Sequence, residues 1–102
     1  MDLHEWFRVN AKLLQLGQDA LSLDMAAGVL QLSIDMANKH ERYELLVEAI
    51  LMLVFMSDKR THALNSALKD LISYILEQCP PARALFISEM NETSPSLLKV
   101  LL

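Results

Sequence analysis

The chain has 102 residues, of which 53% are hydrophobic, and a formal net charge of −4. This length suits one domain, and we expect residues 1–102 to form a single helical domain. Its nine basic residues are scattered, which argues against the clustered positive charge that nucleic-acid binding needs. A single cysteine excludes a disulfide framework and a cysteine zinc site, and without a signal-peptide pattern we expect a cytoplasmic protein.

The composition predicts an all-α fold. Leu, Ala and Met, which are strong helix formers, supply most of the apolar residues. The chain has only two glycines and three prolines, fewer turn residues than a sheet protein of this size needs. We therefore expect a compact bundle of four main antiparallel helices, with a short fifth helix and a C-terminal tail.

The first predicted helix covers roughly residues 2–16. Asp2 and Glu5 have the spacing of a helix-capping pair. Apolar residues then recur at three- and four-residue steps, beginning with Leu3, Trp6 and Phe7. Gly17 is placed to end this helix, because it accepts a left-handed backbone without steric cost.

The second predicted helix, residues 20–38, has two apolar stripes and a narrow polar face. One stripe comprises Leu23, Ala27, Leu30, Ile34 and Ala37, and the other comprises Leu21, Met25, Val29, Leu32 and Met36. Two stripes predict two sets of neighbours for this helix. Gly28 costs helix propensity, and either another backbone approaches it closely or it is a neutral surface residue.

The third predicted helix, residues 41–57, contains a run from Leu45 to Met56 in which Glu48 is the only polar residue. The run is too short to cross a bilayer, so other helices or another subunit must cover it, and we expect helices 2 and 3 to be the buried pair. Its polar stripe of glutamates stops after Glu48, and Met52, Phe55 and Met56 continue the same side. These three residues are our main candidates for partner contact.

The remaining segments are shorter or more regular. Residues 61–78 predict the most clearly amphipathic helix, with Leu64, Ala67, Leu68, Leu71, Ile72 and Ile75 inward. Pro80 and Pro81 end it, and a helix over residues 82–91 follows. The last segment, residues 96–102, is apolar; it is docked on the body, held by a partner or cut from a longer chain. Leu98 and Leu101 in it are further candidate partner-binding residues, as is Gly28.

No pattern of catalytic or metal-binding residues stands out. The three histidines form no His-Glu-x-x-His motif, and we expect no metal, no cofactor and no small-molecule substrate. Glu48 lies within an apolar run, where burial would raise its pKa, but its spacing from Glu41 and Glu44 favours a solvated stripe. Cys79 precedes Pro80 at a helix end and is best explained as a structural residue.

We therefore expect a non-enzymatic protein-interaction module. It would be a small acidic adaptor or chaperone-like binder that covers an apolar surface of a partner or of a second copy of itself. One alternative is a helical dimeric regulator of transcription or of another nucleic-acid-linked process, using Lys59, Arg60 and Lys69. Another is a small enzyme with an acidic site near Glu48.

Overall fold

The computed structural model describes residues 2–14, 20–55 and 62–102. Within these ranges the chain forms helices and no strands, so the predicted all-α class is confirmed. The described residues contain six helices: α1 (Leu3–Leu14), α2 (Ala20–His40), α3 (Tyr43–Phe55), α4 (His62–Gln78), α5 (Ala82–Thr93) and α6 (Pro95–Leu101). The fifth helix is as long as the first, 12 residues each, and the expected tail is itself largely helical.

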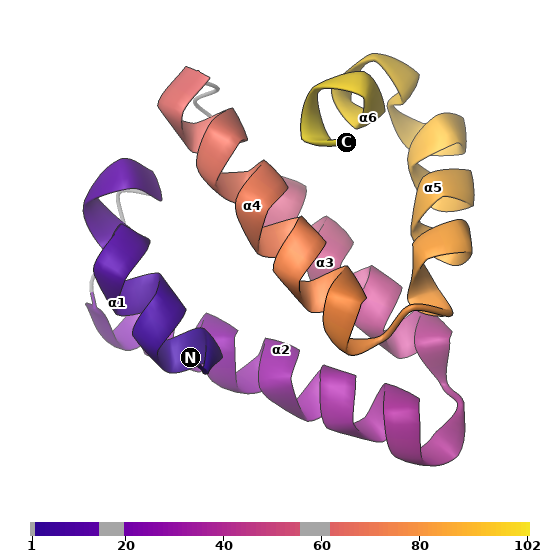
Figure 1. Cartoon of the computed structure of the whole chain (residues 1–102), viewed down its shortest axis with the longest axis horizontal. Coiled ribbons are helices and arrows are strands. Elements are labelled where there is room, and N and C mark those ends of the chain that lie inside the picture. Colours follow the sequence, from indigo (N-terminus) through magenta and orange to yellow (C-terminus); the bar gives the residue numbers. More distant parts are fainter. Residues whose placement is uncertain (1, 15–19, 56–61) are drawn as a thin grey trace.

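The contacts between helices form a closed cycle, or ring, that does not follow the chain order. Going round it, α1 contacts α2, α2 contacts α3, α3 contacts α5, α5 contacts α6, α6 contacts α4, and α4 returns to α1. In the view of Figure 1, α4 crosses in front of α3, and α2 runs along the lower edge. Within the described residues, large apolar side chains on one side of α2 and of α3 remain exposed.

The first helix begins as its sequence predicts. The Asp2 carboxylate Oδ1 accepts a hydrogen bond of 2.8 Å from the backbone N–H of Glu5, which satisfies one of the unpaired donors of the first turn. Leu3, Trp6 and Phe7 are buried, and the Trp6 and Phe7 rings meet edge to face at 5.9 Å between centroids. The predicted end at Gly17 lies outside the described residues.

The link between α2 and α3 differs from the prediction. The sequence places the start of the third helix at Glu41, but α2 continues to His40 and α3 begins at Tyr43. Glu41 has a φ of 55°, the left-handed conformation that commonly follows a helix C-terminus. Glycine usually fills this position, so a glutamate there gives no sequence signal for the helix end.

The core is made from one face of most helices. All six predicted inward residues of α4 are buried, and Leu76 joins them, so this prediction is confirmed. In α2 the first stripe is buried over its whole length, from Leu23 to Ala37. The prediction that α2 and α3 are the buried pair is wrong, because the side chains of Leu32 and Met52 are 60% and 73% exposed.

Candidate partner-binding face

The second apolar stripe of α2 lies on the outside of the molecule. A helix turns 100° per residue, so Met25, Val29, Leu32 and Met36, spaced by four, three and four residues, fall on one side of it. Their exposed fractions are 64%, 57%, 60% and 39%. The two stripes of α2 therefore have different surroundings: one faces the core and the other faces solvent.

On α3 the exposed side changes from acidic to apolar along the helix. Glu44 and Glu48 are exposed in its first half, and Met52 and Phe55 are exposed one and two turns further on. Glu48 is thus part of a solvated stripe, as the glutamate spacing favours. Met52 and Phe55, predicted as partner contacts, are on the surface, and Met56 lies outside the described residues.

These six residues, Met25, Val29, Leu32 and Met36 of α2 with Met52 and Phe55 of α3, are called here the α2–α3 face. They are six of the nine large apolar side chains that are exposed in the described part of the chain. Soluble monomers expose single apolar side chains routinely, but a contiguous group commonly marks a site of interaction. This concentration on two adjacent helices makes the α2–α3 face the main candidate site.

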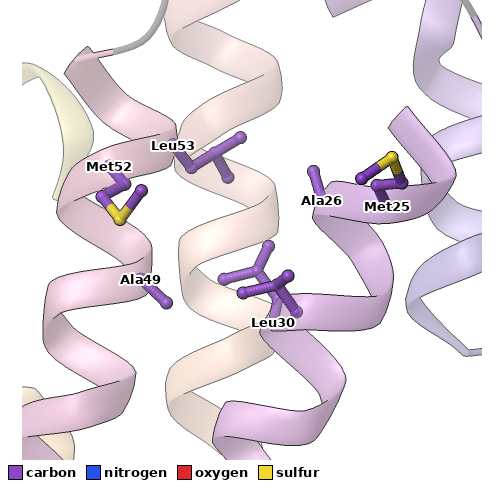
Figure 2. A pocket seen from close by; sticks show the side chains of 7 residues that line it. Met25, Ala26, Leu30, Ala49, Met52 and Leu53 are labelled. Atoms are coloured by element: carbon purple, nitrogen blue, oxygen red, sulfur yellow. The ribbon is translucent and has the colours of Figure 1, made fainter. Parts of the chain in front are cut away.

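A groove runs between α2 and α3 within this face, and its volume is about 270 Å³. Met25 and Met52 lie on opposite sides of it (Figure 2). Ala26 and Ala49 also line the groove, and their small side chains leave space between the two helices. Every residue that lines the groove is apolar: Met25, Ala26, Val29, Leu30, Ala49, Met52 and Leu53. It can take up an apolar side chain, and its lining side chains offer no hydrogen-bonding group to a polar one.

Charged side chains lie along the borders of the face. Asp24 forms an ion pair with Arg8 across the α1–α2 contact, with 3.8 Å between Nε and Oδ1. Near the other end of α2, Lys39 and His40 occupy the last turn. Arg42 donates to Glu44 in an exposed pair, and this hydrogen bond lowers the pKa of the Glu44 carboxyl. The face is thus bordered by acid at the start of α2 and by basic residues at its end.

The other predicted partner-binding residues lie elsewhere. Leu98 and Leu101 are buried in the structure, with 8% and 0% of their surface exposed, so α6 docks on the body of the chain through them. A Cβ on Gly28 would meet His4 Nε2 of α1 at 3.8 Å. Gly28 therefore faces a side chain of the same chain and not another backbone, which was the first of its two alternatives, and these three residues are left out of the candidate site.

The residues that sequence reasoning missed are the four of α2. The stripe itself is visible in the sequence, but its presence predicts a second set of neighbours without saying whether these belong to the same chain. The chain has more apolar helix stripes than it has helices to cover them. This excess is the sequence signal that could have identified the second stripe of α2 as exposed. Among the described residues, the four side chains of this stripe remain exposed.

A second, smaller hollow of about 110 Å³ lies between α3 and α5. Glu44, Glu48 and Glu89 border it together with Val47, Leu51 and Leu85. Among the described residues no group of three or more His, Cys, Asp or Glu side chains is arranged to hold a metal ion. Glu48, the carboxylate of the enzyme hypothesis, is exposed at the side of this hollow.

Cys79 lies in the short link between α4 and α5. Its side chain is buried, and its thiol is free. Burial raises the pKa of this thiol, while a hydrogen bond from the backbone of Ala82 opposes the rise. A raised pKa keeps the sulfur protonated at neutral pH, where the thiol is a poor nucleophile. This is the behaviour expected of a structural cysteine.

In the part of the chain that the structure describes, no helix has the length and apolar content to cross a membrane. A comparison of the chain with protein-family models, curated proteins and solved structures finds no match. Function must therefore be inferred from the chemistry of the site itself.

Proposed function

We propose that the protein is a non-enzymatic interaction module, an adaptor or chaperone-like binder, that buries the α2–α3 face against an apolar surface of another protein chain. One observation carries the proposal: six large apolar side chains are exposed on two adjacent helices, and three of them, Met25, Val29 and Met52, line an apolar groove between these helices. Water is displaced from such a face when a partner covers it, and this displacement is the main driving force for association.

The size of the face sets the strength of binding. Full burial of a large apolar side chain contributes about 1.5–3 kcal/mol, and these side chains are already partly buried, so about 1 kcal/mol for each is available. Six of them contribute about 6 kcal/mol, which lies near the lower end of the ~4–15 kcal/mol that association costs in lost motion. A tight complex therefore needs the groove and the charged borders as well as the six side chains.

Methionine is suited to this role. Three of the six residues, Met25, Met36 and Met52, carry a flexible, polarisable thioether that adapts to irregular surfaces. Such residues are common where a surface must fit a partner by repacking. We propose that the cytoplasm is where it acts, since its single cysteine is a free, buried thiol.

The test is a double substitution on α3, Met52→Lys with Phe55→Lys, in the full chain. Both side chains are exposed, so we expect circular dichroism to show unchanged helix content and sedimentation or affinity purification to show loss of the complex. The matched control is Ser66→Lys with Ser73→Lys, which places the same charges on exposed positions of α4. A complex that survives the α3 variant as well as it survives the control would refute the proposal.

A further inference from the structure

We infer that the α2–α3 face is covered by a second copy of this chain, in a two-fold dimer whose α2 helices pack side by side and antiparallel. This inference depends on the proposed function, because it names the partner that the same face binds. Closed two-fold symmetry is the commonest arrangement of soluble oligomers, and it requires a surface that is complementary to itself. The exposed stripe of α2 meets that requirement in three ways.

The first is its spacing. The steps from Met25 to Val29, Leu32 and Met36 are four, three and four residues, so the stripe reads the same in both chain directions. When two copies of α2 run antiparallel about the midpoint of the stripe, Met25 faces Met36 of the second copy, and Val29 faces Leu32. Each large side chain then meets another large side chain, and this register is the only one that matches all four.

The second is the groove. Met25 lines it from α2, and Met52 borders it from α3 (Figure 2). Because the antiparallel register brings Met36 of the second copy to Met25, that flexible side chain reaches the groove. The two-fold symmetry repeats this contact, so Met36 of each copy fills the groove of the other copy. The α2–α3 face of each copy is thereby buried. A single helix from an unrelated partner would bury it once.

The third is charge. Asp24 and Lys39 lie near opposite ends of the exposed stripe and on the same flank of α2, with Gly28 and Asp35 between them. The two-fold axis that relates two antiparallel helices lying side by side is perpendicular to the plane of the two helices. This flank of α2 therefore faces the same side of the dimer in both copies. Asp24 therefore comes close to Lys39 of the second copy, at both ends of the interface. Arg8, which pairs with Asp24 in the same chain, adds positive charge on the side where Asp35 of the second copy passes.

The first experiment measures the mass of the full chain in solution by sedimentation at concentrations from nanomolar to hundreds of micromolar. We expect a concentration-dependent dimer. Leu32→Glu places a charge at the centre of the interface in both copies, and we expect it to weaken dimerisation at least ~100-fold with helix content unchanged. Ser66→Glu, on the exposed side of α4, is the control and should leave the dimer intact.

The second experiment tests the antiparallel register without touching an apolar residue. Asp24→Lys alone or Lys39→Asp alone brings like charges together twice in the dimer, and we expect each to weaken it about 10-fold, more at low salt than at high salt. In a heterodimer of the two variants, Lys at position 24 of one chain meets Asp at position 39 of the other at one end, and the native Asp24–Lys39 pair remains at the other end. The mixture should therefore form a heterodimer about as stable as the wild-type dimer.

The outcomes separate the two proposals. A wild-type chain that is monomeric throughout, or a dimer unaffected by Leu32→Glu, overturns the inference. A mixture that fails to recover overturns the antiparallel arrangement. If the chain is monomeric but loses a different protein partner on Met52→Lys with Phe55→Lys, the proposed function stands and only the second copy is excluded as the occupant.

Discussion

Asn38, in the last turn of α2, donates a hydrogen bond of 3.0 Å from its Nδ2 to the backbone carbonyl of Gln78, the last residue of α4. The two residues are 40 positions apart in the chain. The bond satisfies one of the carbonyls that a helix C-terminus leaves unpaired. It also fixes the end of α4 against α2, two helices that are not neighbours in the ring described above.

Asn38→Asp should destabilise the fold by about 1 kcal/mol more than the same change at Asn91. The substitution keeps the side-chain shape but replaces the N–H donor by a carboxylate oxygen facing a carbonyl, and a lost hydrogen bond of this kind costs about 0.5–1.5 kcal/mol. Both asparagines are exposed in the last turn of a helix, so Asn91→Asp includes the same unfavourable charge at a helix C-terminus. Urea unfolding of both variants gives the difference, and equal losses would show that the bond contributes nothing.

The fold class and much of the core could be predicted from the sequence, because apolar periodicity is a local property. The inward residues of α4 follow from three- and four-residue steps alone, and so does the buried stripe of α2. The end of α2 could not be predicted in this way. Glu41 has a left-handed φ, and a glutamate in the sequence does not indicate this conformation. The sequence therefore predicts the end of α2 at residue 38, two residues before its end in the structure.

The candidate site was predictable only in part. Met52 and Phe55 could be identified because they continue the side of α3 that carries the glutamates. The glutamates indicate that this side faces solvent, so the apolar residues that follow on it are expected to face solvent as well. The stripe of α2 offers no such contrast. Whether Leu32 or Leu30 faces the core depends on where α1, α3 and α4 pack, which is set by contacts between distant residues. For the same reason Leu98 and Leu101 could not be distinguished from an exposed apolar segment.

Gly28→Ala should make the protein more stable by about 0.5–1 kcal/mol. Gly28 lies inside α2, where glycine is less favourable than alanine by about this amount. The added Cβ meets His4 Nε2 at 3.8 Å, an ordinary van der Waals distance, so nothing has to move. Thermal or urea unfolding measures the gain. Gly28→Leu is the comparison: its longer side chain enters the space that His4 occupies, and it should lose the gain. Loss of stability in the alanine variant would mean that α1 lies closer than this distance allows.

Stability should depend on the ionisation of Cys79 at alkaline pH. Burial raises the pKa of the thiol in the folded protein, so the folded state holds the proton more tightly than the unfolded chain does. The resulting stability is fully present below the pKa of the thiol in the unfolded chain and is lost as pH rises through the higher folded pKa. The free energy of unfolding of the wild type, minus that of Cys79→Ala, should therefore decrease as the pH rises past the pKa of the thiol in the unfolded chain. The subtraction removes the titration of other groups, and a difference that stays constant with pH would contradict the prediction.

The adjacent residues Val100 and Leu101 of α6 should respond very differently to truncation. Leu101 is fully buried, and Leu101→Ala removes apolar contacts and leaves a cavity, at a cost of about 2–4 kcal/mol. Val100 is 46% exposed, and Val100→Ala should change stability by no more than about 0.5 kcal/mol. Urea unfolding of the two variants measures both effects at the same helix. Because α6 contacts α4 and α5, the loss should affect the cooperative unfolding of the whole chain and not the last helix alone. Equal, small effects at both positions would mean that Leu101 is not held in the core in solution, and that α6 is free to contribute to binding a partner.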